Sequence, residues 1–178
     1  MPKAIGIDFG YKNCRVAIKS GKDIKILKNI ENEDATPSVV GYHKGQFIVG
    51  DPAVNRMVSA PKDTIISVKS LIGRAYSDPV VQMVKKCYHY EIVPSDGKDG
   101  NAMVVLGGKQ YSPVQISAMI FKKLKEDADR RVNDTVEYAV INMPAYFTDK
   151  KRDAVRNAGQ LAGLKVQKVL DEPTAAAI

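Results

Sequence analysis

The sequence predicts an α/β fold, a mixed five-stranded sheet covered by helices with an α+β subdomain inserted into it. Three short apolar runs near the amino end are spaced like the strands of a meander, whose neighbours pair antiparallel. Near the carboxyl end, apolar runs of strand length alternate with a helical pattern. Because strand–helix–strand units cross over right-handed and give parallel neighbours, these observations together predict a sheet of mixed direction.

The first part of the chain alternates apolar and polar residues in short runs, which is typical of strands. A polar turn around Gly21 separates the second run from the third and predicts a hairpin. Strands are expected over residues 4–9, 14–18, 24–27, 34–40 and 46–50.

Residues 39–111 are interpreted as the inserted α+β subdomain, because prolines and loop glycines interrupt them often. An aspartate followed by a proline is a typical helix start, and this pair occurs twice. It predicts helices from Asp51 to about residue 58 and from Asp78 to about residue 86, with strands over residues 88–93 and 102–106. The flanking residues, 1–38 and 112–178, then form the core subdomain.

Ser112 and Gln115 form a capping box with a proline at the first helical position. Apolar residues recur every four positions behind it, so a helix of about five turns is predicted, with Lys123 and Lys125 on its wet face. The remaining expected elements are a strand over residues 136–143, a helix from Thr148 or Asp149 to about residue 164, a strand over residues 166–170 and a helix begun by Pro173.

Composition argues against several functional classes. The 27 Lys and Arg outnumber the 20 Asp and Glu by 7, but they are scattered and show no aromatic-basic array of the kind that binds nucleic acid. We expect no secretion leader and no membrane span. Cys14, Cys87, His43 and His89 lack metal-ligand spacing, and a reducing cytoplasmic compartment fits the two cysteines.

Three polar residues follow apolar segments where a cleft could form. Asp8 ends the first strand just before the glycine turn 10–13. A carboxylate there can hold the water shell of Mg²⁺, and backbone N–H groups of such a turn can face phosphate oxygens. Lys69 and Glu172 also follow apolar runs. Taken singly, each residue is better explained by an ordinary role, for Asp8 the capping of a turn.

Taken in order, six segments resemble the seventy-kilodalton heat-shock chaperones, the DnaK-like family. They are IGIDFG at residues 5–10, TPSVV at 36–40, VGDPA at 49–53, VKSLIGR at 68–74, MPAYFTD at 143–149 and DEPTAAA at 171–177. The resemblance spans the chain and implies the first lobe of that family's ATPase domain, which has the actin-like fold. The second lobe and the substrate-binding domain would follow Ile178.

The resemblance implies a catalytic role for three residues. Asp8 matches the residue that holds Mg²⁺ through water, Lys69 the lysine that positions the attacking water, and Glu172 a catalytic carboxylate at the cleft floor. Hydrolysis of a phosphoanhydride needs charge neutralisation and an oriented water more than covalent chemistry, so these residue types suit ATP and Mg²⁺. The first phosphate loop would consist of Gly10, Tyr11, Lys12 and Asn13.

The resemblance also implies partners. Pro144 and Arg152 match the switch that connects the nucleotide state to the substrate-binding domain, and the surface from Lys168 to Asp171 would meet J-domain cochaperones. The expected partners of the whole protein are therefore a J-domain cochaperone, a nucleotide exchange factor and unfolded polypeptide clients.

Three residues depart from the family pattern. Tyr11 and Lys12 stand where two small hydroxyl residues are usual, and Asp171 stands where asparagine is usual. A tyrosine is too large to approach phosphate as a threonine does, and Asp171 beside Glu172 adds charge that repels phosphate. Lys12 could partly offset this, although a mobile ammonium is less directional than a hydroxyl.

We therefore expect the first lobe of a DnaK-like chaperone, with very weak nucleotide binding and no useful turnover by this chain alone. The alternative is a non-enzymatic interaction module, or short divergent homologue, whose nucleotide site is defunct. A different actin-like kinase or filament protein is a third alternative, but residues 68–74 and 171–177 fit the chaperones far better. Because the remainder of such a protein would cover apolar surface of this lobe, weak self-association is also expected.

Overall fold

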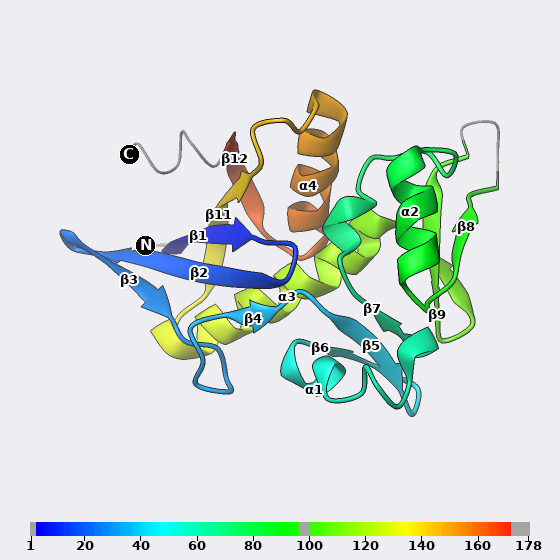
Figure 1. Cartoon of the computed structure of the whole chain (residues 1–178). Coiled ribbons are helices and arrows are strands. Elements are labelled where there is room, and N and C mark those ends of the chain that lie inside the picture. Colours follow the sequence, from blue (N-terminus) through cyan, green and yellow to red (C-terminus); the bar gives the residue numbers. More distant parts are fainter. Residues whose placement is uncertain (1–2, 97–99, 172–178) are drawn as a thin grey trace.

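The computed structural model describes residues 3–96 and 100–171 (Figure 1). The predicted catalytic residue Glu172 and the helix expected to begin at Pro173 lie outside the described residues. A large mixed sheet and two smaller antiparallel sheets organise the described chain. The fold is therefore mixed α/β, as the sequence predicts.

The large sheet has the strand order β12-β11-β1-β2-β3, and a short sixth strand, β4, pairs with β2. Strand β1 pairs parallel with β11, and β11 pairs parallel with β12, so strands from the first and last parts of the chain lie in one sheet. Strands β1, β2 and β3 form the predicted antiparallel meander. The strands of the large sheet are β1 (Lys3–Phe9), β2 (Asn13–Ser20), β3 (Asp23–Leu27), β4 (Thr36–Pro37), β11 (Val136–Met143) and β12 (Lys165–Asp171).

The alternation of β1 decides which face of the sheet becomes the core. Ile5, Ile7 and Phe9 are buried on one face, while Gly6 and Asp8 lie on the other. The Phe9 ring meets the Phe121 ring edge to face at 4.8 Å. Asp8 is thus left at the strand's carboxyl end on the open face, which is the position a cleft residue needs.

Helices α3 (Pro113–Val132) and α4 (Asp149–Leu161) pack against each other and against the strands at the β11–β12 side. The Ser112 capping box is present as predicted, with the Ser112 hydroxyl accepting from the Gln115 N–H at 3.1 Å. Figure 1 shows α3 crossing beneath the sheet strands and α4 standing between the sheet and the α2 region. The cap and the apolar stripe together fix where α3 starts and which side it buries.

The wet face predicted for α3 is only partly correct. Lys123 lies 2.6 Å from Asp127 and 3.2 Å from Glu31, and Lys125 lies 2.7 Å from Asp129. Lys123 and Lys125 keep only 16% and 18% of their side chains exposed because these ion pairs hold them down.

Two small sheets and two short helices occupy the stretch between β4 and α3. Strands β5 (Val40–His43), β6 (Gln46–Val49) and β7 (Thr64–Ile65) form one sheet. The other contains β8 (Ile92–Pro94), β9 (Ala102–Leu106) and β10 (Lys109–Tyr111). The helices are α1 (Asp51–Val54) and α2 (Pro79–Cys87), and 3₁₀ turns cover η1 (Pro61–Asp63) and η2 (Val68–Ser70).

Two of the elements predicted in this stretch are wrong in extent. Helix α1 ends at Val54 rather than near residue 58, and Gly50, not Asp51, is its N-cap. Turns follow it, so it never becomes a long helix. Strand β8 starts at Ile92, four residues later than expected, because Tyr88 and Tyr90 are used for tertiary contacts instead of strand pairing. Helix α2, by contrast, starts where predicted, since the Asp78 side chain accepts from the Val80 N–H.

The edge strand β3 exposes apolar side chains. Ile24 is 77% and Ile26 is 54% exposed, and Ile26 borders a shallow hollow over the open face of the sheet, together with Gly6, Ala17 and Val140. Exposed apolar surface of this kind favours association, so weak self-association stays a prediction. No helix among the described residues is long and apolar enough to cross a membrane.

Candidate functional site

The turn between β1 and β2 is held in one shape by Ser38. The Ser38 N–H donates to the Lys12 carbonyl at 2.8 Å, and the Ser38 hydroxyl donates to the Gly10 carbonyl at 2.9 Å. A Cβ atom on Gly10 would lie 2.1 Å from the Asn13 carbonyl oxygen. The turn therefore closes only because glycine occupies position 10. Ser38 lies within the TPSVV segment, but nothing local in the sequence indicates which residues it binds.

Lys69 is brought beside this turn by η2. Its Nζ atom donates to the Phe9 carbonyl, which joins residues 60 positions apart at the end of β1. Aromatic rings surround it, with centroids 4.9 Å (Tyr11), 5.4 Å (Phe9) and 5.7 Å (Phe147) away. Only 2% of Lys69 is exposed, which is rare for lysine unless its charge is compensated. A cation thus lies at the base of the turn.

Two tyrosines hold the backbone that leads into Lys69. The Tyr90 hydroxyl donates to the Ile66 carbonyl at 2.8 Å, and the Tyr88 hydroxyl shares a hydrogen bond with the Ser67 hydroxyl at 3.0 Å. Ser67 has a φ of 55°, a left-handed conformation that costs energy for a residue other than glycine. The tyrosine pair therefore stabilises an unfavourable turn directly before η2.

We expect Tyr90→Phe to lower the free energy of unfolding by about 1 kcal/mol, because the partly buried Ile66 carbonyl loses its partner while the packed ring stays. Urea denaturation measures this, with Tyr138→Phe on β11 as the matched hydroxyl deletion. Equal stability of the two variants would show that the Ile66 carbonyl finds another donor.

Asp8 lies on the open face of the sheet at the edge of the same turn. Its carboxylate is 44% exposed and lies 3.8 Å from the Arg15 guanidinium. Exposed ion pairs of this length are worth little, so Arg15 can release the carboxylate. A single accessible carboxylate fits Mg²⁺, which keeps several of its waters. Among the described residues there is no cluster of three or more His, Cys, Asp or Glu that could enclose a metal ion.

Tyr11 projects from the turn toward the segment that precedes α4. Its hydroxyl shares a hydrogen bond of 2.7 Å with the Tyr146 hydroxyl. The neighbouring Phe147 ring is buried and contacts two lysines. The Lys151 ammonium lies 5.0 Å from the ring centroid, and the Lys69 ammonium lies 5.7 Å from it. Burial, followed by the nearby Arg74 charge, lowers the pKa of Lys151. Tyr146 and Phe147 belong to the MPAYFTD segment, but only the tertiary fold reveals their contact with Tyr11 and Lys69.

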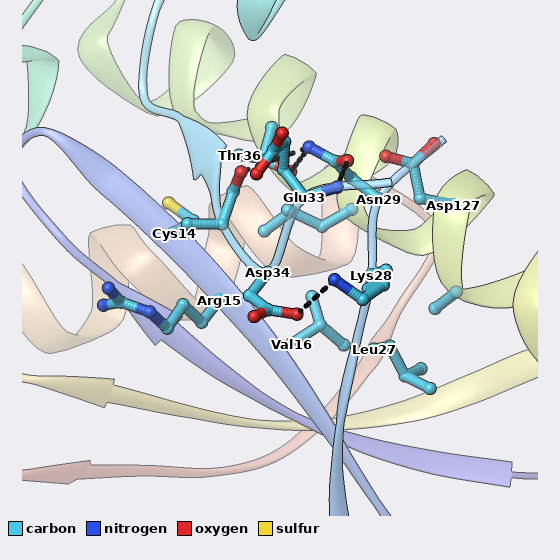
Figure 2. Close-up of a pocket in the computed structure, with 13 residues that line it drawn as sticks. Cys14, Arg15, Val16, Leu27, Lys28, Asn29, Glu33, Asp34, Thr36 and Asp127 are labelled. Carbon is cyan, nitrogen blue, oxygen red and sulfur yellow. Dashed lines mark hydrogen bonds and ion pairs between the residues drawn. The ribbon is translucent and has the colours of Figure 1, made fainter. Parts of the chain in front are cut away.

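Behind the turn, the loop that leads into β4 is closed by its own hydrogen bonds (Figure 2). The Asn29 side chain donates to Thr36 and accepts from the Glu33 N–H, and Lys28 pairs with Asp34 at 3.2 Å. The cavity they enclose is about 10 Å³, which has room for about one water molecule. This pocket is therefore too small for a nucleotide.

Cys14 lines the same small cavity and is fully buried. Because the Ser38 hydroxyl gives its one hydrogen to Gly10, the Cys14 thiol donates to Ser38 Oγ at 3.2 Å. Burial raises the pKa of the Cys14 thiol to about 11. The thiol is therefore protonated and supports the turn, and it is a poor nucleophile.

The remaining predicted site residues occupy different places. Lys12 and Asn13 are exposed on the turn, beside Tyr11. Pro144 is buried directly after β11 and Arg152 is half-buried in the first turns of α4. Lys168 is exposed on β12, and Asp171 ends that strand opposite Met143. The turn, Asp8 and Lys69 thus form one group, while Pro144 and Arg152 follow the end of the neighbouring strand β11.

The mixed sheet, with an acidic residue and a glycine turn at the end of its central strand, is that of an actin-like ATPase lobe. A family model described as Hsp70 protein matches residues 4–178. The chain belongs to the Hsp70 family, whose members are chaperones that bind ATP.

Proposed function

We propose that this chain forms the phosphate-binding wall of the nucleotide site in a DnaK-like chaperone. The observation that carries the proposal is the position of Lys69, whose ammonium contacts the carbonyl of Phe9 between Asp8 and the glycine turn. A lysine 60 residues away in sequence is buried where an acidic strand end meets the glycine turn. Surface roles explain Asp8 and the turn singly, but they do not explain a buried lysine there.

Within this proposal each group has one task. The backbone N–H groups of residues 10–13 face the phosphate oxygens, Lys69 positions the attacking water near the terminal phosphate, and Asp8 holds the water shell of Mg²⁺. Glu172 is proposed, from the family motif alone, as a catalytic carboxylate at the cleft floor. Bound Mg-ATP supplies the phosphoanhydride whose hydrolysis needs this positioning and charge neutralisation.

The surfaces for partners are also proposals. Pro144 is buried at the end of β11, and Arg152 sits one helical turn into α4, so movement at the nucleotide would reach them through the turn that holds Tyr146. Lys168 and Asp171 on β12 would meet a J-domain cochaperone. Nucleotide exchange factor and unfolded polypeptides are the further partners proposed for the whole protein, in a cytoplasmic setting.

A second candidate function is a non-enzymatic interaction module. The contact of Tyr11 with Tyr146 and Lys69 favours it, because the tyrosine ring fills space that a phosphate would need. In that case the loop would keep its shape without ever exchanging a ligand.

Nucleotide titration separates the two functions. We expect Mg-ADP and Mg-ATP to shift the amide NMR signals of residues 10–13 with a dissociation constant no tighter than roughly 1 mM, because Lys69 is covered. Asp8→Asn should reduce the Mg²⁺-dependent part of the shift, whereas Asp23→Asn in the β2–β3 hairpin should not. Hydrolysis by the chain should be negligible and unchanged in Lys69→Ala.

Two outcomes would contradict these expectations. Unmoved loop amides at about 10 mM Mg-ADP would overturn nucleotide binding and favour the interaction module. A micromolar constant, or turnover that depends on Lys69, would show instead that the site is open and complete.

A further inference from the structure

Tyr11 connects two segments that are 135 residues apart. Its hydroxyl shares the 2.7 Å hydrogen bond with Tyr146, which lies between β11 and α4. Tyr11 itself belongs to the turn between β1 and β2. The bond therefore ties the glycine turn to the segment that starts α4.

The same residue covers Lys69. The Tyr11 ring centroid lies 4.9 Å from Lys69 Nζ, closer than the Phe9 or Phe147 ring. Phe9 and Phe147 are buried, whereas Tyr11 is 36% exposed. Of the three rings, Tyr11 therefore lies nearest the solvent, and an anion approaching Lys69 from the turn meets this ring first.

We propose that Tyr11 is a latch that closes the phosphate site, held shut by its hydrogen bond to Tyr146 and by its ring on Lys69. A phosphate group reaches Lys69 only after the ring has moved aside. This inference rests on the proposed function, because the ligand it excludes is a phosphate bound at residues 10–13. The class of ligand admitted by the open latch is a pyrophosphate-type anion that contacts the loop amides and Lys69 together.

The contact to Tyr146 is suited to opening. Tyr146 is 67% exposed, and water can replace a single exposed bond between two neutral hydroxyls at little cost. The Tyr146 ring also meets the Phe147 ring edge to face at 5.6 Å, and Phe147 is buried against Lys69 and Lys151. Displacement of Tyr11 would therefore also move Tyr146 and Phe147, the residues that lead into α4.

Lysine labelling tests the latch without any nucleotide. The full chain is treated with a limiting amine-acylating reagent, and mass spectrometry follows acylation of Lys69 relative to exposed lysines such as Lys22. We expect Tyr146→Phe, which keeps the ring, to raise the Lys69 rate about threefold, and Tyr11→Thr to raise it about tenfold. Tyr138→Phe is the matched control and should leave the rate unchanged.

Pyrophosphate titration then tests what the latch controls. Inorganic pyrophosphate is added to the same variants while the amide NMR signals of residues 10–13 are followed. We expect about threefold tighter binding in Tyr146→Phe and about tenfold tighter binding in Tyr11→Thr, with no change in Tyr138→Phe.

The outcomes distinguish the latch from the function it rests on. Lys69 labelling that is equal in all four proteins would overturn the latch. Raised labelling, with pyrophosphate bound equally by every variant, would also overturn it but would leave the phosphate-binding function intact. Absence of pyrophosphate binding in every variant would overturn the proposed function itself.

Discussion

Replacing Gly10 with alanine is expected to lower the free energy of unfolding by roughly 3 kcal/mol and to displace the turn that carries Tyr11. The added Cβ would lie 2.1 Å from the Asn13 carbonyl oxygen and 3.3 Å from the Asn13 carbonyl carbon. Both atoms belong to the backbone at the start of β2, so no side chain can rotate away to make room. The turn must open, which costs more than filling a flexible gap.

Opening the turn also disturbs its hydrogen bonds. Ser38 binds the carbonyls of Gly10 and Lys12, and each such bond contributes about 1 kcal/mol net. The expected loss therefore combines overpacking with weakened anchoring at Ser38. The amide chemical shifts of residues 10–13 should change along with the loss of stability, and the Tyr11–Tyr146 contact should be weakened as well.

Gly6→Ala is the matched control. Gly6 lies on β1, the strand that leads into the turn, and a Cβ there would have the Ala17 carbonyl oxygen as its nearest neighbour, at 3.9 Å. That is ordinary contact, so the control should change the free energy of unfolding by less than about 0.5 kcal/mol. If urea denaturation gives the two variants the same stability, the turn is more adaptable than its hydrogen bonds indicate.

The elements of this fold that the sequence predicts well are those with local signals. The Ser112 capping box and the apolar repeat behind it predict α3, and Asp78 before Pro79 predicts the start of α2. The β2–β3 hairpin follows from the polar turn around Gly21. In each case a few neighbouring residues decide the conformation, so no tertiary information is needed.

Local signals were less decisive where tertiary contacts compete. Asp51 before Pro52 is the same pattern as Asp78 before Pro79, yet α1 stops after four residues. Strand β10 was not predicted, although the Gly107–Gly108 pair after β9 is a usable hairpin signal. Lys123 was expected in solvent because helical periodicity cannot show that Glu31, 92 residues earlier, would pair with it.

The candidate site shows the same division. The strand-end position of Asp8 and the glycine turn were visible in the sequence, because both belong to one short segment. The aromatic surroundings of Lys69 were not, since they come from β1, the turn after it and the segment before α4. The size of Tyr11 indicated a blocked loop, but the Tyr146 hydroxyl that holds it depends on the packing of β1 against β11.

The second large effect is expected at alkaline pH, where ionisation of Cys14 should remove about 2–3 kcal/mol of stability. Burial raises the pKa of this thiol from 9.0 to about 11 in the folded chain. Between these values the unfolded chain loses a proton that the folded chain keeps, so unfolding becomes easier as pH rises. The stabilising contribution is complete below pH 9 and is lost as pH rises through 11, at about 1.4 kcal/mol per pH unit.

Ionisation of Cys14 would also act on the site. The protonated thiol donates to Ser38, and Ser38 donates to the Gly10 carbonyl. A thiolate can only accept, so the Ser38 hydroxyl would turn toward the sulfur and release Gly10. The glycine turn should therefore loosen before the whole chain unfolds, which amide exchange at residues 10–13 can detect.

Cys14→Ser isolates this contribution, because a serine hydroxyl keeps the donor and does not titrate in this range. Unfolding free energies of the original chain and the variant are compared from pH 8 to pH 11, and groups common to both cancel in the difference. Between pH 8 and pH 11 we expect the free energy of unfolding of the original chain to fall by about 2–3 kcal/mol relative to that of Cys14→Ser. At neutral pH a thiol reagent should modify exposed Cys87 rapidly and buried Cys14 slowly. A pH-independent difference, or two thiols that react equally fast, would show that Cys14 is not enclosed beneath the turn.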